Sequence, residues 1–287
     1  MRERAVVAAV VLASLCLVQP AHAQFLDGTL LKIKSSGTLN LGYRDSSPPF
    51  SFTLEGKPAG YSVDLCTIVS RAIQAKLGLA DLKISWIPVN AENRVQMVVD
   101  GKVDLECSTT TASLARQERV DFSLMTFVDG AGLITLASKT LASTPDLAGK
   151  RIAIIPDTTT EKVLAQGLKS IQVTATMVPV KDHAQGLAAV EEGRADAFVS
   201  DRSILAGLAI TSKDPKRFAL SRNSFSYEPY GLMMRRNDAA FRLVVNRAIA
   251  DLYRSGAVLQ LYDRWFGALG APGEALQAMY LINALPE

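Results

Sequence analysis

The residues most able to do chemistry lie between positions 104 and 122, in the segment DLECSTTTASLARQERVDF. Thr109, Thr111 and Ser113 precede a short predicted helix that contains Arg116. The first backbone N–H groups of a helix have no partner and its dipole is positive there, so hydroxyls, N–H groups and a guanidinium together form a receptor for a carboxylate. The alternative is an ordinary Ser/Thr helix cap beside a surface arginine. The segment has no nucleophile–base pair, so we predict binding and no catalytic residue.

Further polar residues follow other predicted strands. In open α/β sheets, ligands bind beyond the carboxyl ends of the strands. The residues in that position are Arg44, Arg94, Thr109, Thr111, Arg116, Thr158, Thr159, Asp182, His183 and Asp201. Three arginines and an acid around one cleft suit a small ligand with two carboxylates and one ammonium. His183 is the only histidine after position 23, so we predict no metal site, and we expect no cofactor.

The elements that must position these residues alternate along the first half of the chain. Hydrophobic periodicity predicts strands at 38–43, 50–54, 83–88, 103–106 and 120–122 and helices at 29–35, 62–77 and 95–100. Gly37, Gly78 and Gly101 follow these helices as end signals. This alternation predicts an α/β protein with mostly parallel sheets flanked by helices.

The second half repeats the plan. It reads as strand 150–156, helix 162–170, strand 174–180 and helix 185–192, with Thr158 and Glu161 at capping-box spacing. The segment EGRADAF, which starts at Glu192, echoes DGKVDL, which starts at Asp100. Two similar α/β lobes explain the echo, although two ordinary helix–strand loops would also look alike. A strand at 230–235 and helices at 239–255, 258–266 and near 274–285 complete the prediction.

The N-terminus and composition limit the class of protein. A basic start, an apolar run at 5–18 and Ala21-His22-Ala23 predict a cleavable signal peptide over residues 1–23. Its removal leaves 29 basic and 27 acidic residues, a net charge of +2, so nucleic acid is not an expected partner. Cys66 and Cys107 remain; in an oxidising compartment they could pair, and buried free thiols are an equal alternative.

The order of these motifs resembles the periplasmic amino-acid-binding proteins of ABC importers, family 3 of the solute-binding proteins, over nearly the whole mature chain. GYSVDL and the R…VDFS pattern are typical of the family as a whole. The segments YRDSS, ENR, ECSTT and KDH make the chain most similar to the glutamate/aspartate-binding members. Asn90, Ser108 and Asp157 depart from the usual pattern, which leaves glutamate, aspartate and their amides open.

The resemblance implies a two-lobed Venus-flytrap fold with two hinge strands. Lobe 1 would comprise 24–130 and 228–287, and lobe 2 would comprise 131–227, with hinges near 129–132 and 225–228. The implied protein is a periplasmic monomer that captures glutamate or aspartate and delivers it to an ABC transporter permease.

The resemblance also implies a role for each site residue. Arg116 and Thr111 would hold the α-carboxylate, with Thr159 adding a contact from lobe 2. Asp201 and Thr109 would hold the amino group. The side-chain carboxylate would go to Arg44, Arg94 and His183. Structural roles stay open for several: His183 could cap the following helix, and Phe50 and Phe52 could flank the ligand or pack in the core.

Two other functions compete with this one. Secreted cyclohexadienyl or arogenate dehydratases share the scaffold, but they need an acid beside a leaving group, whereas this predicted cleft is dominated by Arg and Thr. A ligand-sensing module that signals to a membrane receptor has the same sequence requirements as a transport receptor.

Overall fold

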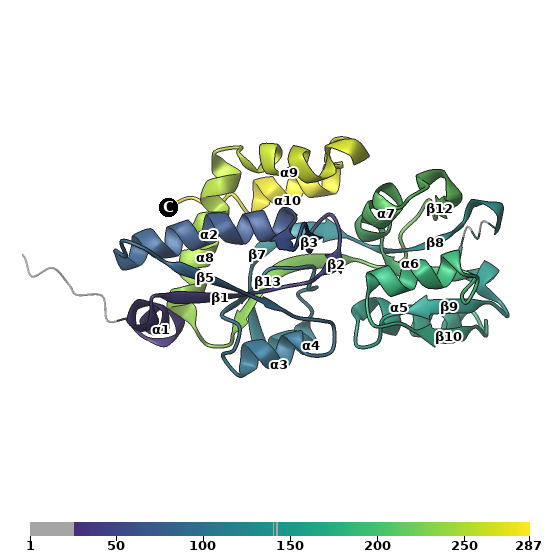
Figure 1. The fold of residues 1–287 in the computed structure, drawn as a ribbon, viewed down its shortest axis with the longest axis horizontal. Coiled ribbons are helices and arrows are strands. Elements are labelled where there is room, and N and C mark those ends of the chain that lie inside the picture. Colours follow the sequence, from purple (N-terminus) through teal and green to yellow (C-terminus); the bar gives the residue numbers. More distant parts are fainter. Residues whose placement is uncertain (1–25, 140, 142) are drawn as a thin grey trace, which may run out of the picture.

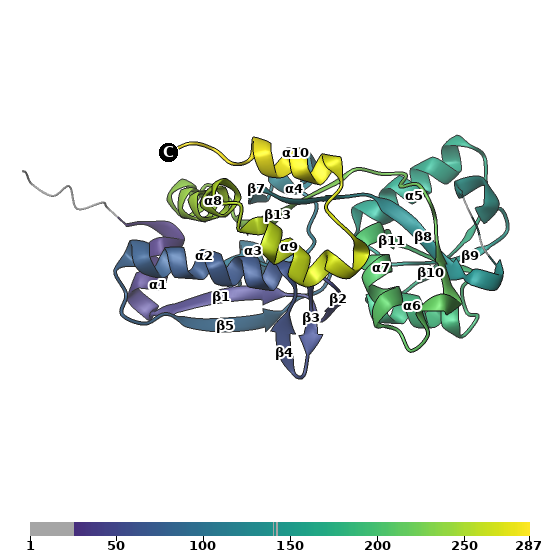
Figure 2. The same ribbon diagram turned by 90° about the horizontal axis from the view of Figure 1, so that it is seen from above.

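A computed structural model describes residues 26–139, 141 and 143–287. It consists of two bodies side by side, each a five-stranded sheet covered by helices (Figures 1 and 2). The predicted signal peptide, residues 1–23, lies outside the described residues. The two-lobed α/β fold predicted from the alternating elements is confirmed.

The first sheet has the strand order β5-β1-β6-β13-β7. Its strands are β1 (Thr38–Tyr43), β5 (Lys83–Pro88), β6 (Leu105–Glu106), β7 (Val120–Asp129) and β13 (Glu228–Arg235). The helices of this body are α1 (Gly28–Ser36), α2 (Tyr61–Leu77), α3 (Arg94–Val99), α4 (Leu114–Gln117), α8 (Ala239–Arg254), α9 (Val258–Phe266) and α10 (Glu274–Ile282). Strand β13 is antiparallel to both of its neighbours, whereas β1, β5 and β6 run parallel.

The second sheet has the strand order β10-β9-β11-β8-β12. Its strands are β8 (Ala131–Leu136), β9 (Arg151–Ile154), β10 (Thr176–Pro179), β11 (Ala197–Asp201) and β12 (Phe218–Leu220), and its helices are α5 (Thr159–Ser170), α6 (His183–Glu191) and α7 (Arg202–Thr211). Here β8 is the strand that runs against the others. Both sheets place their first parallel strand between the second and the third, so the sequence echo marks two lobes of the same plan.

The chain crosses between the two bodies twice. The first crossing joins β7 to β8 at Gly130, and the second joins β12 to β13. The crossings lie side by side, because Glu228 at the start of β13 pairs with Asp129 at the end of β7 (Figure 1). A small sheet of β2 (Ser46–Ser47), β3 (Ser51–Leu54) and β4 (Lys57–Ala59) lies on the first body, and its strand β2 contacts α6 and α7 of the second.

An aromatic cluster forms the centre of the first body. Phe50 is fully buried, and its ring packs edge-on against those of Tyr61, Phe127, Tyr230 and Phe266 at centroid distances of 4.8–6.2 Å. Phe50 is therefore a core residue, and Phe52 packs edge-on against Trp265. Neither lines the pocket described below, so both have the core-packing role that the sequence left open.

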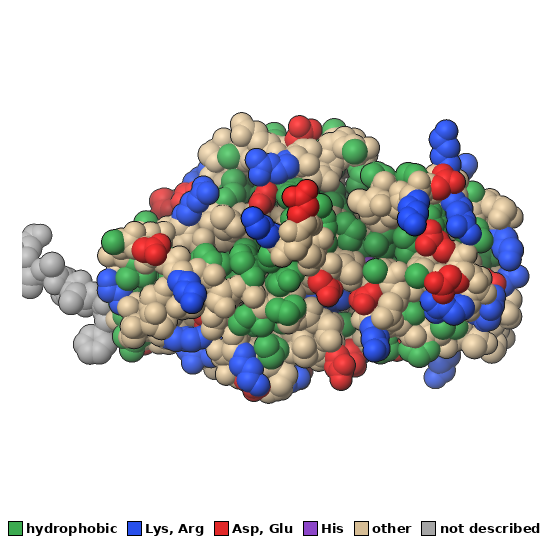
Figure 3. All heavy atoms as spheres, viewed as in Figure 1, with side chains coloured by type: hydrophobic (Ala, Val, Ile, Leu, Met, Phe, Trp, Pro, Cys, Tyr) green, Lys and Arg blue, Asp and Glu red, His purple; other side chains and the backbone are tan. Residues whose placement is uncertain are grey.

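The surface carries charges of both signs. Figure 3 shows lysine and arginine side chains interspersed with aspartate and glutamate over the face in view. Among the described residues, no helix combines the length and the hydropathy needed to span a bilayer.

Candidate functional site

Nine of the ten strand-end residues named from the sequence line one pocket between the two bodies, and Asp182 does not. The wall also contains five residues that the sequence argument did not select: Ile155, Thr160, Val199, Ser200 and Ile204. Four of these lie in or directly after strands of the second sheet or in α7, where buried apolar and small residues carry no binding signal. Thr160 is the exception, because it continues the hydroxyl run that starts at Thr158.

Two arginines form the side of the pocket nearest the first sheet. Arg44 follows β1 and Arg94 begins α3, and each is only 3 % exposed. Burial, and next the charge of Arg94, lower the pKa of Arg44 to about 10, and burial lowers the pKa of Arg94. Among the described residues, neither guanidinium lies within salt-bridge distance of a carboxylate. Two adjacent buried cations without a direct counter-ion favour binding of an anion between them.

Glu106 is a charged neighbour that the sequence argument missed. It is fully buried, and neither oxygen has a hydrogen-bond partner among the described residues. Burial raises the pKa of Glu106, while the charge of Arg94 opposes that rise most strongly. The Thr110 hydroxyl also favours the ionised form, although it lies outside hydrogen-bond geometry. Glu106 thus offsets part of the positive charge without filling the pocket.

Arg116 lies on α4, and its side chain lines the pocket and is not a free surface arginine. Ser113 caps the helix and accepts a hydrogen bond from the backbone N–H of Arg116 at 3.4 Å. The guanidinium Nη1 donates to the Thr111 carbonyl at 2.8 Å. Burial, then the charge of Arg94, lower the pKa of Arg116 to about 10. The segment therefore contains both an ordinary cap and an arginine fixed against the pocket.

His183 begins α6 and is 5 % exposed. Its Nδ1 lies 2.8 Å from the hydroxyl of Ser47 on the first body. Burial lowers the pKa of His183 well below 6.5, and the charges of Arg44 and Arg94 lower it further, so the imidazole is neutral at pH 7. The helix is capped by Asp182, which accepts from the N–H of Gln185 at 2.8 Å. His183 is therefore free of the capping role, and Asp182, expected in the cleft, is the cap.

The threonines divide into two groups by the partners of their hydroxyls. Thr158 caps α5: its oxygen accepts from the N–H of Glu161 at 3.1 Å and its proton goes to the Ile155 carbonyl at 2.8 Å. Thr111 and Thr159 both donate to the carboxylate of Glu228, at 2.5 and 2.7 Å. A hydroxyl has one proton, so none of these three side chains can donate to a ligand in this structure.

Asp201 supplies the acid of the pocket and contacts both bodies. It accepts hydrogen bonds from Thr160 at 3.0 Å and from the Tyr230 hydroxyl of the first body. Burial, and then the nearby charges of Asp129 and Glu228, raise the pKa of Asp201 to about 7. Asp201 was predicted from the sequence but Tyr230 was not, because a tyrosine within a buried strand ordinarily belongs to the core.

This raised pKa predicts that the contact of the two bodies at Asp201 depends on pH. An unfolded or exposed aspartate releases its proton near pH 3.9, whereas Asp201 in this structure releases it near 7. Protonation therefore stabilises this contact fully below about pH 4, and the stabilisation is lost as the pH rises through 7. We expect small-angle scattering of ligand-free protein to show a smaller radius of gyration at pH 5 than at pH 8. Asp201→Asn should remove most of that change; a radius that is the same at both pH values contradicts the assignment.

A helix of the second body lies against a turn of the first. A Cβ placed on Gly207 of α7 would lie 2.5 Å from the carbonyl oxygen of Pro48, in the turn between β2 and β3. That distance is well below van der Waals contact, so only glycine permits this approach.

We therefore expect Gly207→Ala to weaken ligand binding about tenfold or more by opposing closure. Alanine favours the helix itself by about 1 kcal/mol over glycine, so the melting temperature of ligand-free protein should not fall. Gly167→Ala in α5 is the matched control, because nothing lies within 4 Å of its Cβ position. Titration calorimetry on both variants measures the effect, and equal affinities for the two variants contradict it.

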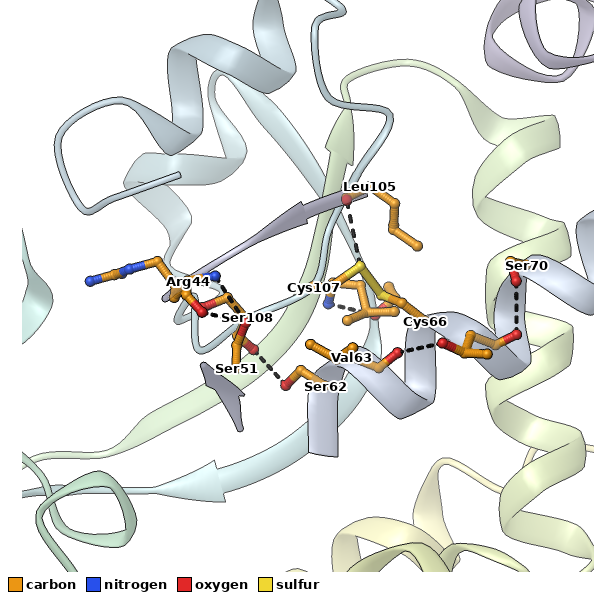
Figure 4. The surroundings of a disulfide bond; sticks show 12 residues. Arg44, Ser51, Ser62, Val63, Cys66, Ser70, Leu105, Cys107 and Ser108 are labelled. Atoms are coloured by element: carbon orange, nitrogen blue, oxygen red, sulfur yellow. Dashed lines mark hydrogen bonds between the residues drawn. A yellow bond between two sulfur atoms is a disulfide. The ribbon is translucent and has the colours of Figure 1, made fainter. Parts of the chain in front are cut away.

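A disulfide holds the first-body half of the pocket. Cys66 of α2 is bonded to Cys107 at the end of β6, 41 residues further along the chain. The Ser62 hydroxyl donates to the Ser108 carbonyl at 2.9 Å, and Figure 4 shows both links joining the start of α2 to the same loop. The pairing that the sequence left open is present, and it anchors the segment that continues into Thr109 and Thr111.

Comparison with known proteins identifies the family of the chain. The model of the bacterial extracellular solute-binding proteins, family 3, matches residues 22–268. The chain belongs to this family.

Curated proteins similar to the chain include some named for binding glutamate and aspartate, and others, at 23–26 % identity, named for binding L-cystine or glutamine. The chain is 39 % identical over 252 residues to the L-glutamate/L-aspartate-binding protein of Pseudomonas aeruginosa, which covers 87 % of this chain and 83 % of that protein. It is 34 % identical over 253 residues to the glutamate/aspartate import solute-binding protein of Salmonella typhimurium, with 86 % and 83 % covered. Among solved structures, an ancestral amino-acid-binding protein that is a precursor of cyclohexadienyl dehydratase matches with a TM-score of 0.72 at 26 % identity, covering 83 % of this chain and all of that one.

Proposed function

We propose that the protein binds an acidic L-amino acid, glutamate or aspartate, between its two lobes and delivers it to an ABC importer. The observation that carries the proposal is the pair of buried guanidinium groups, Arg44 and Arg94, which face the pocket without a carboxylate at salt-bridge distance among the described residues. An amide or apolar side chain would leave the positive charge that Glu106 does not offset without a partner. The two curated glutamate/aspartate-binding relatives named above support the same ligand class.

Three parts of the pocket would take the three charges of the ligand. Arg116 would hold the α-carboxylate, because its planar fork matches both oxygens. Asp201 and Thr109, which both line the pocket, would hold the ammonium. Arg44, Arg94 and the neutral imidazole of His183 would hold the side-chain carboxylate. Several charge-assisted hydrogen bonds of about 1.5–3 kcal/mol each support a micromolar complex of about −8 kcal/mol after ordering costs.

The mechanism we propose is closure of two lobes. Lobe 1 would comprise 24–130 and 228–287, and lobe 2 would comprise 131–227, with hinges at the two crossings. Ligand first docks on lobe 1, whose pocket loop is anchored by the disulfide, and lobe 2 then adds contacts that exist only in the closed form. The ligand shifts the open–closed equilibrium by its differential affinity for the two forms.

The cellular setting follows from the same proposal. Residues 1–23 would direct export, the mature protein would act in the periplasm as a monomer, and a membrane permease would recognise its closed form. The protein would act by binding alone, without a reaction. Asp201, the acid of the pocket, is already engaged by Thr160 and Tyr230 and suits an ammonium better than proton transfer to a leaving group.

Titration calorimetry of refolded, ligand-free protein 24–287 tests the proposal. The ligands are glutamate, aspartate, glutamine, asparagine, arginine and prephenate. We expect glutamate or aspartate to bind at least about tenfold, or 1.4 kcal/mol, more tightly than either amide. Binding of only an amide, arginine or prephenate contradicts the proposal. Loss of water and carbon dioxide from prephenate or arogenate would instead establish the dehydratase.

A further inference from the structure

Glu228 is a buried acid with no place among the proposed ligand contacts. It is the first residue of β13 and is 1 % exposed. It does not line the pocket; its register partner is Asp129, so it lies where the two crossings run side by side. A charge buried at that point has to be compensated by hydrogen bonds.

Three hydroxyls donate to this carboxylate from different parts of the molecule. Oε2 accepts from Thr111 of the first body and from Thr159, the first residue of α5 in the second body, at 2.5 and 2.7 Å. Oε1 accepts from Ser226 of the second crossing at 2.8 Å. The Ser226 oxygen in turn accepts from the N–H of Ala131, just after the first crossing, at 2.9 Å. One side chain thus connects both bodies and both crossings.

We propose that Glu228 is a positioning residue that latches the two lobes in the closed form. The bonds from Thr111 and Ser226 remain within the first body and the crossings. The bond from Thr159 exists only while the start of α5 lies against the loop that carries Thr111. Hydrogen bonds to a carboxylate are about twice as strong as neutral ones, so this bond favours closure and slows ligand release.

The latch also fixes what two pocket threonines offer to a ligand. Because Thr111 and Thr159 give their only protons to Glu228, their oxygens present lone pairs to the pocket. Lone pairs suit an ammonium and not a carboxylate. The α-carboxylate then relies on Arg116 and on N–H groups at the start of α5, which differs from the hydroxyl contacts that the sequence resemblance implied for Thr111 and Thr159.

A double-mutant cycle between Glu228 and Thr159 tests the latch. The variants are Glu228→Ala, Thr159→Val and the double mutant, studied with whichever of the twenty amino acids the wild-type protein binds. We expect Glu228→Ala to increase the dissociation rate at least tenfold in stopped-flow measurements. Thr159→Val should then cost at least fivefold less affinity in the Glu228→Ala background than in the wild type. Glu228→Gln, whose amide oxygen still accepts hydrogen bonds, should restore part of the loss.

A merely structural role for Glu228 gives a different result. It would lower the melting temperature of ligand-free protein and leave the effects of the two substitutions independent, which overturns the proposal. Glu118→Ala, at an exposed glutamate, controls for loss of one negative charge. Ser226→Ala removes a donor that lies on the second crossing itself and not at the start of α5, and we expect it to change the dissociation rate less than threefold.

The effect on ligand release rests on the proposed function, whereas the effect on closure does not. A second measurement therefore uses ligand-free protein, with spin labels on the outer surfaces of the two lobes. We expect Glu228→Ala to shift the interlobe distances toward longer values, and unchanged distances overturn the latch. If no amino acid binds the wild type, the proposed function fails, and this distance measurement alone decides the latch.

Discussion

Arg116→Ala will abolish binding of every amino acid, whatever its side chain. The guanidinium is fixed by its bond to the Thr111 carbonyl and half-buried in the pocket wall, so no neighbouring group can replace it. Loss of two charge-assisted hydrogen bonds of about 1.5–3 kcal/mol each weakens binding by roughly 10² to 10⁴. Calorimetry with glutamate, aspartate and glutamine measures this loss.

Arg119→Ala is the matched control for this prediction. Arg119 lies three residues further along, is exposed, and donates to the side chain of Gln96. Its removal should leave affinity unchanged within about twofold, as surface charges contribute little. An Arg116→Ala protein that keeps its affinity within fivefold of the wild type would remove Arg116 from the site.

Arg44→Ala and Arg94→Ala will discriminate between acidic ligands and their amides. Each buried guanidinium pairs with the side-chain carboxylate in the proposed complex, whereas an amide makes only weaker neutral bonds to it. We expect losses of at least ~100-fold for glutamate and under ~10-fold for glutamine. Calorimetry across the same ligand series gives the ratio directly.

The ligand-free stability of these two variants provides a second check. Burial lowers the pKa of both guanidinium groups, and the charge of Arg94 lowers that of Arg44 further, so removing one relieves an unfavourable charge. The melting temperature of ligand-free protein should therefore not fall. Arg71→Ala, at an exposed arginine of α2, is the control. Equal affinity losses for glutamate and glutamine would mean that these arginines do not bind the side-chain carboxylate of the ligand.

Local pattern was sufficient for most of the fold. The strand predicted at 38–43 is β1, and the helix predicted at 258–266 is α9, each with the predicted bounds. Helix α2 ends at Gly78 in the left-handed conformation, as its position after the apolar periodicity indicated. These predictions are correct because the hydrophobic periodicity of each segment indicates which face is buried.

Other features depend on residues far apart in the chain. Strand β7 was predicted only over 120–122 but extends to Asp129, because it pairs along its length with β13, about a hundred residues later. The Cys66–Cys107 bond requires α2 to lie beside β6, which spacing alone does not specify.

The site residues likewise divide into those that local sequence predicts and those that depend on distant parts of the chain. Residues at strand ends were found by a general rule of α/β sheets. Glu106, Tyr230 and Glu228 lie within strands or at their start, where the sequence indicates only core, and their roles come from side chains brought to them by the other lobe or by α3. Their partners could not be inferred without the tertiary structure.

The central place of β13 constrains the order in which the protein can be assembled. The second sheet is built entirely from residues 131–220, so it can be completed while later residues are still being synthesised. The first sheet cannot, because the strand between β6 and β7 is supplied by residues 228–235. Until those residues emerge, β6 and β7 expose unpaired backbone edges of the kind that promote aggregation. The first body, which contains the N-terminal strands, is therefore the last to complete its sheet. A chain interrupted before residue 235 can complete the second sheet but not the first.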